Sequence, residues 1–137
     1  MAAADLAVGK WDLENSENFD EYMKELGVGF ATRLIGNKAK PRQEISIDNG
    51  EWTIKTSTSL SGTEIKFKPG VPFQEKTMDG RNVTSTCTID GNKLIQNQKA
   101  EKDKLDSNIV RDFKKDSFLM TLTAGKVTCT REYKKVN

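Results

Sequence analysis

The stretch Gln43–Ser57, which reads QEISIDNGEWTIKTS, decides the fold class of this chain. Residues 43–48 and 51–57 are short runs rich in isoleucine and threonine, which is typical of β-strands. Between them lie Asn49 and Gly50, residue types that tolerate the positive φ angles of a two-residue hairpin turn. The stretch therefore predicts an antiparallel β-hairpin.

The same pattern continues to the C-terminus. Asp79-Gly80 and Asp90-Gly91 are further hairpin signals, and Ser61-Gly62 and Ala124-Gly125 are weaker turn signals. The predicted strands that follow the first hairpin are Thr63–Lys68, Phe73–Lys76, Asn82–Ile89, Lys93–Lys99, Ser107–Lys114, Ser117–Thr123 and Lys126–Lys135. With Gly9–Leu13 near the N-terminus, about ten strands are expected, an antiparallel meander that forms a sandwich or a barrel.

Two helices are predicted between the first strand and the others. Asn18 is a candidate N-cap, with Glu21 three residues later as in a capping box, and Gly27 ends this helix. A second helix fits about Gly29–Lys38 and ends before Pro41, because proline disfavours helix in the residue before it.

Closure of the sheet follows from its edges. A ten-stranded meander would leave two long exposed edges, which proteins avoid, and closure into a barrel removes them. We therefore expect an all-β fold, a closed, ten-stranded antiparallel β-barrel with the helix pair as a lid over one end. Residues 1–137 are expected to form one domain, since no linker or internal repeat interrupts the pattern.

Charge and composition exclude several classes of protein. Lys and Arg number 22 against 20 Asp and Glu, interleaved along the chain, which argues against nucleic-acid binding but permits a weak membrane encounter. Residues 1–5 lack the features of a signal peptide, so none is expected, and no apolar run is long enough to span a bilayer. Cys87 and Cys129 are expected to be free thiols.

The chain contains no histidine, which argues against an enzyme. Histidine is the commonest general base and metal ligand, so its absence removes Ser-His-Asp and Cys-His catalysis and most zinc sites. An isomerase or hydrolase that used Tyr133 or Cys129 would need a base beside it, and none is evident. We expect no metal and no cofactor.

The last predicted strand places charged residues inside the barrel. Alternation puts Arg131 and Tyr133 on the same face as Val127 and Cys129, while the opposite face is polar and charged. In the strand 107–114, Arg111 likewise shares a face with apolar neighbours. A buried guanidinium must find an anion or ordered water. Either a ligand carboxylate meets these side chains, or a glutamate from another strand pairs with the arginines in a structural network.

Several blocks of sequence, spread over essentially the whole chain, resemble one known family. The blocks are Gly9–Leu13, Asn18–Gly29, Phe30–Arg33 with Lys40-Pro41, Thr63–Ile65 with Phe67, Asp79–Arg81 and Val127–Tyr133. In content and spacing they resemble the intracellular lipid-binding proteins, and within these the fatty acid-binding proteins of the heart, brain and epidermal types.

This resemblance implies a ten-stranded, clam-like barrel with a helix-turn-helix cap. It also implies a monomeric, cytoplasmic carrier that binds and transports a long-chain fatty acid without a covalent bond. Arg111, Arg131 and Tyr133 fall on the family's carboxylate-binding positions. The expected tail and portal residues are Phe19, Tyr22, Met23, Val28, Thr32, Pro41 and Leu60, of which Leu60 stands where many relatives have a portal phenylalanine.

Three alternatives to this function remain at the level of sequence. A retinoic acid carrier of the same fold would also bind a carboxylate, although Phe30–Arg33 favours the fatty acid branch. An interaction protein with an empty barrel is a second, and the enzyme considered above is a third. In the lid, Lys24 and Arg33 resemble a basic cluster that relatives use for membrane contact or nuclear import, but Leu34 replaces one of its basic members.

Overall fold

The computed structural model describes residues 2–136 and contains ten strands and three helices within them. The helices are α1 (Ala3–Ala7), α2 (Phe19–Glu25) and α3 (Phe30–Lys38). The strands are β1 (Gly9–Glu17), β2 (Arg42–Asp48), β3 (Glu51–Ser57), β4 (Gly62–Phe67), β5 (Phe73–Lys76), β6 (Asn82–Asp90), β7 (Lys93–Ala100), β8 (Ser107–Phe113), β9 (Ser117–Ala124) and β10 (Val127–Lys135).

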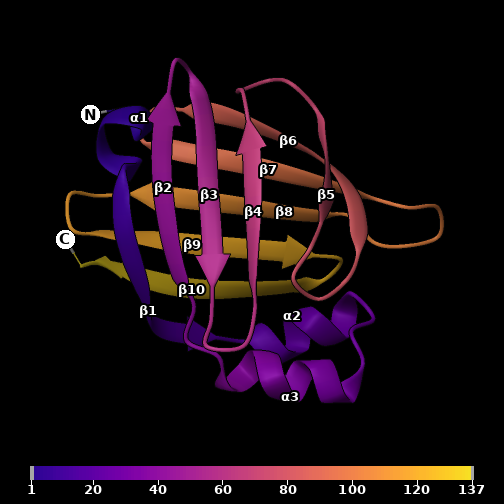
Figure 1. Cartoon of the computed structure of the whole chain (residues 1–137). Helices are drawn as coiled ribbons and strands as arrows, with labels where there is room; N and C mark the ends of the chain where they lie inside the picture. The colour runs from indigo at the N-terminus through magenta and orange to yellow at the C-terminus, as the bar shows by residue number, and fades with distance from the viewer. Residues whose placement is uncertain (1, 137) are drawn as a thin grey trace.

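All ten strands belong to one antiparallel sheet, with the order β4-β3-β2-β1-β10-β9-β8-β7-β6-β5. In Figure 1, β2, β3 and β4 cross in front of β6–β10, so the sheet folds over on itself as a barrel. Helices α2 and α3 lie at one end of this barrel. The predicted all-β barrel with a helix-turn-helix lid is thus confirmed.

The first hairpin forms as predicted. Asn49 and Gly50 have φ angles of 52° and 80°, the left-handed pair that a tight hairpin turn requires. Asp48 pairs with Glu51 directly across the turn, and the register continues to Arg42 opposite Ser57.

The hydrogen-bonded sheet has one opening, between β4 and β5. Within residues 2–136 these two strands form no ladder with each other, so the ring of hydrogen bonds is incomplete. The rings of Phe67 on β4 and Phe73 on β5 stack across the opening with their centroids 5.7 Å apart, and Trp52 stacks on Phe67 from the other side. Aromatic packing therefore connects the two edges, as in a clam-like barrel.

The start of α2 differs from the prediction. Asn18 has a left-handed backbone, with φ of 68°, and its side chain makes no capping hydrogen bond. It donates instead to the backbone oxygen of Thr128 on β10, at 3.0 Å. The predicted capping box with Glu21 is therefore wrong, because a tertiary contact to β10 uses the side chain that would have capped the helix.

The N-terminal segment closes the other end of the barrel and was not predicted. The indole of Trp11 donates to the backbone oxygen of Ala7 at 2.9 Å, and Ala3 N donates to Gly91 O at 2.8 Å. Trp11 also packs edge-on against Phe118. Helix α1 spans only five residues, too few for a periodic pattern to be recognised. The structure describes no helix long and apolar enough to cross a membrane.

Strand β1 is longer than the predicted Gly9–Leu13, since it extends to Glu17. Its register with β10 shifts between Leu13 and Asn15, an irregularity of the β-bulge kind. A bulge interrupts the alternation of apolar and polar side chains, which explains why the second half of this strand was missed.

Candidate ligand cavity

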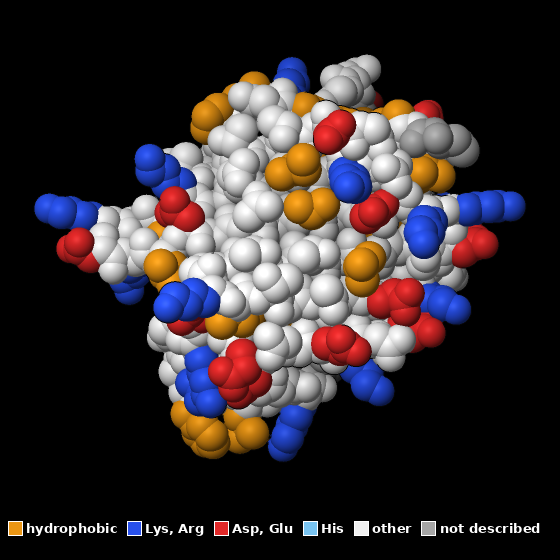
Figure 2. Space-filling model, turned by 180° about the vertical axis from the view of Figure 1, so that it is seen from behind, with side chains coloured by type: hydrophobic (Ala, Val, Ile, Leu, Met, Phe, Trp, Pro, Cys, Tyr) orange, Lys and Arg blue, Asp and Glu red, His pale blue; other side chains and the backbone are white. Residues whose placement is uncertain are grey.

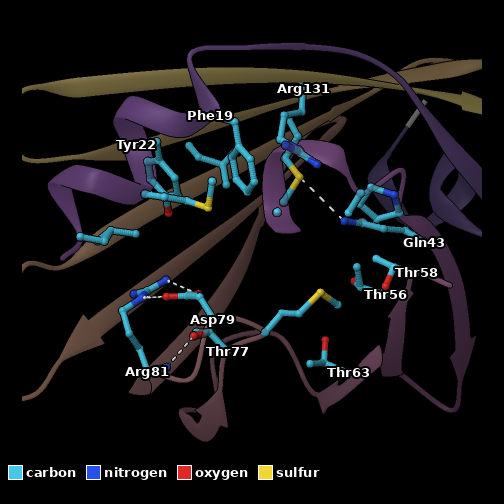
Figure 3. A pocket seen from close by; sticks show the side chains of 18 of the residues that line it. Phe19, Tyr22, Gln43, Thr56, Thr58, Thr63, Thr77, Asp79, Arg81 and Arg131 are labelled. Carbon is cyan, nitrogen blue, oxygen red and sulfur yellow. Dashed lines mark hydrogen bonds and ion pairs between the residues drawn. The ribbon is translucent and has the colours of Figure 1, made fainter. Parts of the chain in front are cut away.

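A cavity of about 240 Å³ lies under the lid, between the two layers of the sheet. Figure 3 shows Phe19 of α2 beside Arg131 of β10 at one end of this cavity and the pair Asp79–Arg81 across from them. Its lining is mainly apolar near the helices and polar along the barrel wall. The predicted residues Arg111, Arg131 and Tyr133 all line it, so strand alternation placed them on the correct face.

Arg111 on β8 is buried, with 3% of its surface exposed, and is held by two amides. Its Nε donates to Gln43 Oε1 at 3.1 Å and its Nη1 donates to Gln96 Oε1 at 3.0 Å. Burial lowers the pKa of Arg111 from its ordinary value, but a guanidinium stays charged in proteins. The two amides supply dipoles but no negative charge to balance it.

Arg131 and Tyr133 on β10 have fewer protein partners. Arg131 Nη1 donates to Ser16 Oγ at 3.1 Å, and its guanidinium lies over the ring of Phe19, 3.8 Å from the centroid. Tyr133 stacks on Phe118 with the centroids 4.7 Å apart, and its hydroxyl forms no hydrogen bond with the described part of the chain. Arg131 and Arg111 both pair with Met120 of the strand between them, so they flank one point of the wall.

Glu75 on β5 is an acidic residue of the cavity that the sequence analysis did not identify. Its Oε1 accepts hydrogen bonds from Ser85 Oγ at 2.6 Å, Gln96 Nε2 at 2.9 Å and Gln98 Nε2 at 3.3 Å. Gln96 therefore links Glu75 to Arg111. The structural network considered above exists in this indirect form, but among residues 2–136 no carboxylate forms an ion pair with Arg111 or Arg131.

A second arginine–carboxylate group lies across the cavity. Arg81 donates from Nε to Asp79 Oδ2 at 2.6 Å and from Nη2 to Asp79 Oδ1 at 3.3 Å. This two-pronged geometry is the strong form of an arginine–carboxylate pair. Asp79 and Arg81 therefore neutralise each other.

The charges of the cavity do not sum to zero. Its charged lining residues are Glu75, Asp79, Arg81, Arg111 and Arg131. Three cations against two anions leave one formal positive charge, located at the two arginines that flank Met120. An anion that enters the cavity would balance this charge.

The predicted tail and portal residues divide into two groups. Phe19, Tyr22, Met23, Thr32 and Pro41 line the cavity. Val28 is buried but lines a separate surface pocket with Leu26 and Gly29, and Leu60 is 77% exposed on the β3–β4 turn. These two residues do not line the cavity.

Tyr22 both packs the lid against the barrel wall and lines the cavity, so the sequence alone could not assign it one of these roles. Its ring lines the cavity and is buried, while its hydroxyl forms a short hydrogen bond with Ser107 of β8. Burial raises the pKa of Tyr22. One side chain thus attaches the lid to the barrel wall and shapes the cavity.

Many lining residues were missed, and some had a signal. Alternation in Gln43–Asp48 places the lining residue Gln43 on the face of Ile45, and in β7 it places the lining residue Gln98 on the face of Leu94. The other missed residues are Leu26, Ile35, Gly36, Ala39, Thr56, Thr58, Ser61, Thr63, Glu75, Thr77, Met78, Asp79, Arg81, Met120 and Leu122.

The fold and the cavity together define a β-barrel protein with an internal cavity whose charged lining residues have a net positive charge. The chain belongs to the lipocalin / cytosolic fatty-acid binding protein family, whose model matches residues 8–136. Members of this family bind and carry fatty acids and are not enzymes.

Individual relatives match over nearly their whole length. The sodium/calcium exchanger regulatory protein 1 of Doryteuthis pealeii is 52% identical over 135 residues, which cover 98% of this chain and 99% of the relative. The solved structure of the REP1-NXSQ fatty acid transporter has 50% identity and a TM-score of 0.92, covering 98% of both chains. The Schistosoma mansoni fatty acid binding protein in complex with arachidonic acid has 38% identity and a TM-score of 0.93, covering 98% and 99%.

The two cysteines are buried free thiols, as predicted. Neither has measurable exposed surface, and burial raises the pKa of Cys87 to about 12 and that of Cys129 to about 11. A protonated, buried thiol is a poor nucleophile and a poor site of oxidation. Cys129 thus lacks the reactivity that a catalytic thiol would need.

We predict that the native protein resists thiol reagents. At pH 8, reaction with Ellman's reagent should be at least about 100-fold slower than in the urea-unfolded protein, because both thiols need an opening of the barrel to react. Release of two equivalents of the coloured product from the native protein as fast as from the unfolded protein would contradict this.

The same pKa shifts give a pH dependence with a definite sign. The folded protein keeps its thiol protons while the unfolded chain loses them above about pH 8.5. The free energy of unfolding should therefore fall as the pH rises from there through the folded pKa values of about 11 and 12. A Cys129→Ala variant should lose less stability between pH 8 and pH 10 than the parent.

Proposed function

We propose that this protein binds one long-chain fatty acid non-covalently inside the barrel and transports it through the cytoplasm. The observation that supports this proposal most strongly is the single unbalanced positive charge of the cavity. A fatty acid has one negative charge and a long apolar chain, so it balances the charge and fills the apolar part of the same space. Similarity to carriers named for fatty acids agrees with this choice.

The carboxylate is proposed to bind at Arg131 and Tyr133, with Arg111 beside them. Arg131 has one protein hydrogen bond and Tyr133 has a free hydroxyl, so both can donate to a carboxylate. Arg111 already donates to Gln43 and Gln96, so its main contribution is its charge and its remaining N–H groups. The three residues thus act as two direct donors and one supporting cation.

The acyl chain is proposed to extend from this head-group site toward the lid. The apolar lining residues along that path are Phe19, Met23, Leu26, Ile35, Pro41, Met120 and Leu122. Burial of a chain is worth about 0.8 kcal/mol per CH₂, so the roughly fourteen CH₂ groups of a sixteen-carbon acid offer about 11 kcal/mol before ordering costs. The tail therefore supplies most of the affinity, and the head group sets the orientation.

Arg131→Gln is the direct test of the head-group assignment. The variant should bind oleate at least about thirtyfold more weakly, because truncating one partner of a buried charged pair costs about 2 kcal/mol or more. Displacement of a fluorescent fatty acid measures the dissociation constant. Arg42→Gln is the matched control, since Arg42 is exposed and pairs with Asp12 on the outer surface, and it should bind as the parent does.

Unchanged oleate binding in Arg131→Gln would contradict the assignment and would favour a barrel that uses its arginines only for structure. Retinoic acid also has one carboxylate, so the charge of the cavity does not separate it from a fatty acid. The same displacement assay does, because stronger displacement by retinoic acid than by oleate would replace the proposed ligand class.

The lid is proposed to contact membranes during transfer of the ligand. Phe30 and Leu34 lie one turn apart on α3 and are 70% and 46% exposed, and Leu60 on the β3–β4 turn is 77% exposed. Figure 2 shows hydrophobic side chains gathered on the surface at the helical end of the molecule. Exposed apolar side chains at the mouth of a cavity are suited to a transient lipid encounter.

We infer a monomer with residues 1–137 as one lipid-binding domain, located in the cytoplasm as the family description indicates. A nuclear signal through Lys24 and Arg33 is not part of this proposal. Lys24 lies 3.8 Å from Asp20 and 3.6 Å from Glu21, and Arg33 donates to Asp20 and to Val28 O. Neighbouring acids thus partly neutralise these cations.

The double variant Phe30→Ser, Leu34→Ser tests the membrane contact. Transfer of a fluorescent fatty acid to vesicles should become at least about fivefold slower, because the lid loses apolar area that enters the bilayer surface. The dissociation constant in solution should stay the same, since neither residue lines the cavity.

Leu119→Ser is the control, because Leu119 is 44% exposed near the start of β9, whereas Glu25 of α2 bonds to Lys126 beyond the other end of that strand. It should leave the transfer rate unchanged. A parent protein whose transfer rate does not depend on vesicle concentration would contradict membrane contact and would favour transfer through solution.

A further inference from the structure

A polar cluster lies in the cavity wall apart from Arg131 and Tyr133. It consists of Glu75 on β5, Ser85 on β6, and Gln96 and Gln98 on β7. Of these, Glu75 and Gln98 line the cavity itself. The cluster therefore presents polar atoms to a space that is otherwise apolar on its lid side.

Gln98 has an acceptor without a partner. Its side chain is 4% exposed, and no donor in the described part of the chain reaches its Oε1 atom, which is itself buried. Exchanging the oxygen and nitrogen positions of the Gln98 amide would not give this acceptor a donor. Its Nε2 donates to Glu75 Oε1, and a flipped amide would place Oε1 against that carboxylate oxygen. The acceptor therefore remains.

Glu75 has a second free acceptor. All three of its hydrogen bonds, from Ser85, Gln96 and Gln98, converge on Oε1. No donor from the described residues bonds to Oε2. Gln98 Oε1 and Glu75 Oε2 thus belong to one cluster, and neither has a donor among the described residues. Gln98 Oε1 is buried, so its lack of a partner costs free energy, whereas Glu75 Oε2 is not a buried atom. Both atoms can accept a hydrogen bond from a ligand that brings a donor.

The position of the cluster fits the middle of an acyl chain. Gln98 pairs with Ser107, which bonds to Tyr22 of the lid, so it lies nearer to the lid than Gln96 and Arg111. It is three strands away from Arg131, or about 14 Å along the wall at the usual strand spacing. A chain whose carboxylate lies at Arg131 and whose tail extends along this wall would pass the cluster at this distance.

We propose that this cluster is a subsite for a hydroxyl group on the middle of a fatty acid chain, so that the barrel accepts hydroxylated fatty acids. This rests on the proposed fatty acid binding. A hydroxyl donates one hydrogen bond, to Gln98 or Glu75, and adds no charge to a cavity that the carboxylate has balanced. A second carboxylate would repel Glu75. A keto or epoxide oxygen only accepts, so it would leave both acceptors unpaired.

The test compares stearate with 12-hydroxystearate, which differ by one mid-chain hydroxyl. The parent should bind 12-hydroxystearate at least as tightly as stearate, measured by titration calorimetry. In Gln98→Leu the ratio of the two dissociation constants should shift against the hydroxy acid by about tenfold, because its hydroxyl loses its partner. Thr56→Val is the matched control, since Thr56 lines the opposite wall, and it should leave the ratio unchanged.

The outcomes separate this subsite from the proposed function. If the parent binds stearate tightly, and Gln98→Leu has the same ratio of 12-hydroxystearate to stearate dissociation constants as the parent, the subsite alone is overturned. Failure of the parent to bind either acid overturns both. If Gln98→Leu does not fold, Gln98→Asn is the second variant. It keeps the amide on a side chain one methylene shorter and should shift the ratio of the two dissociation constants in the same direction. A parent that prefers stearate about tenfold overturns the subsite without any variant.

Discussion

The unbalanced charge of Arg111 and Arg131 inside the barrel is the constraint on which the site depends. Guanidinium groups do not lose their protons in proteins, so the positive charge persists wherever the fold places it. Both side chains are almost fully buried, and neither pairs with a described carboxylate. The barrel thus encloses a net positive charge that an anionic ligand would balance.

Arg111 and Arg131 have different protein partners. Gln43 and Gln96 hold Arg111 from the neighbouring wall, and Gln96 connects it to Glu75. Arg131 instead lies over Phe19 of the lid and has one hydroxyl partner. The arginine that touches the lid is therefore the one with donors to spare. A ligand carboxylate at Arg131 would therefore lie next to the first residue of α2.

Much of this arrangement could be predicted from sequence because it is local. Turn pairs such as Asn49-Gly50 mark the hairpins, and alternation within β8 and β10 places Arg111, Arg131 and Tyr133 inside. The exceptions depend on contacts that are distant in sequence. The side chain of Asn18 bonds to β10 instead of capping α2. The opening between β4 and β5 is determined by how the whole sheet curves.

Glu75 illustrates the limit of pattern reading. It lies on a four-residue strand, too short for alternation to distinguish the inner face, and its three donors come from β6 and β7. The formal charge of the cavity could be counted only once Glu75 and the Asp79–Arg81 pair were placed. The inward position of Arg111, Arg131 and Tyr133 was available from sequence, whereas the charge balance was not.

The ionisation state of a bound fatty acid tests the charge argument most directly. Carbon-13 NMR of carboxyl-labelled palmitate in the barrel reports whether the head group is charged as the pH falls. If the buried arginines hold an anion, the carboxyl resonance should stay at its ionised position through the range near pH 4–5, about where an exposed carboxyl titrates. A resonance that titrates there as a free carboxyl does would contradict the account.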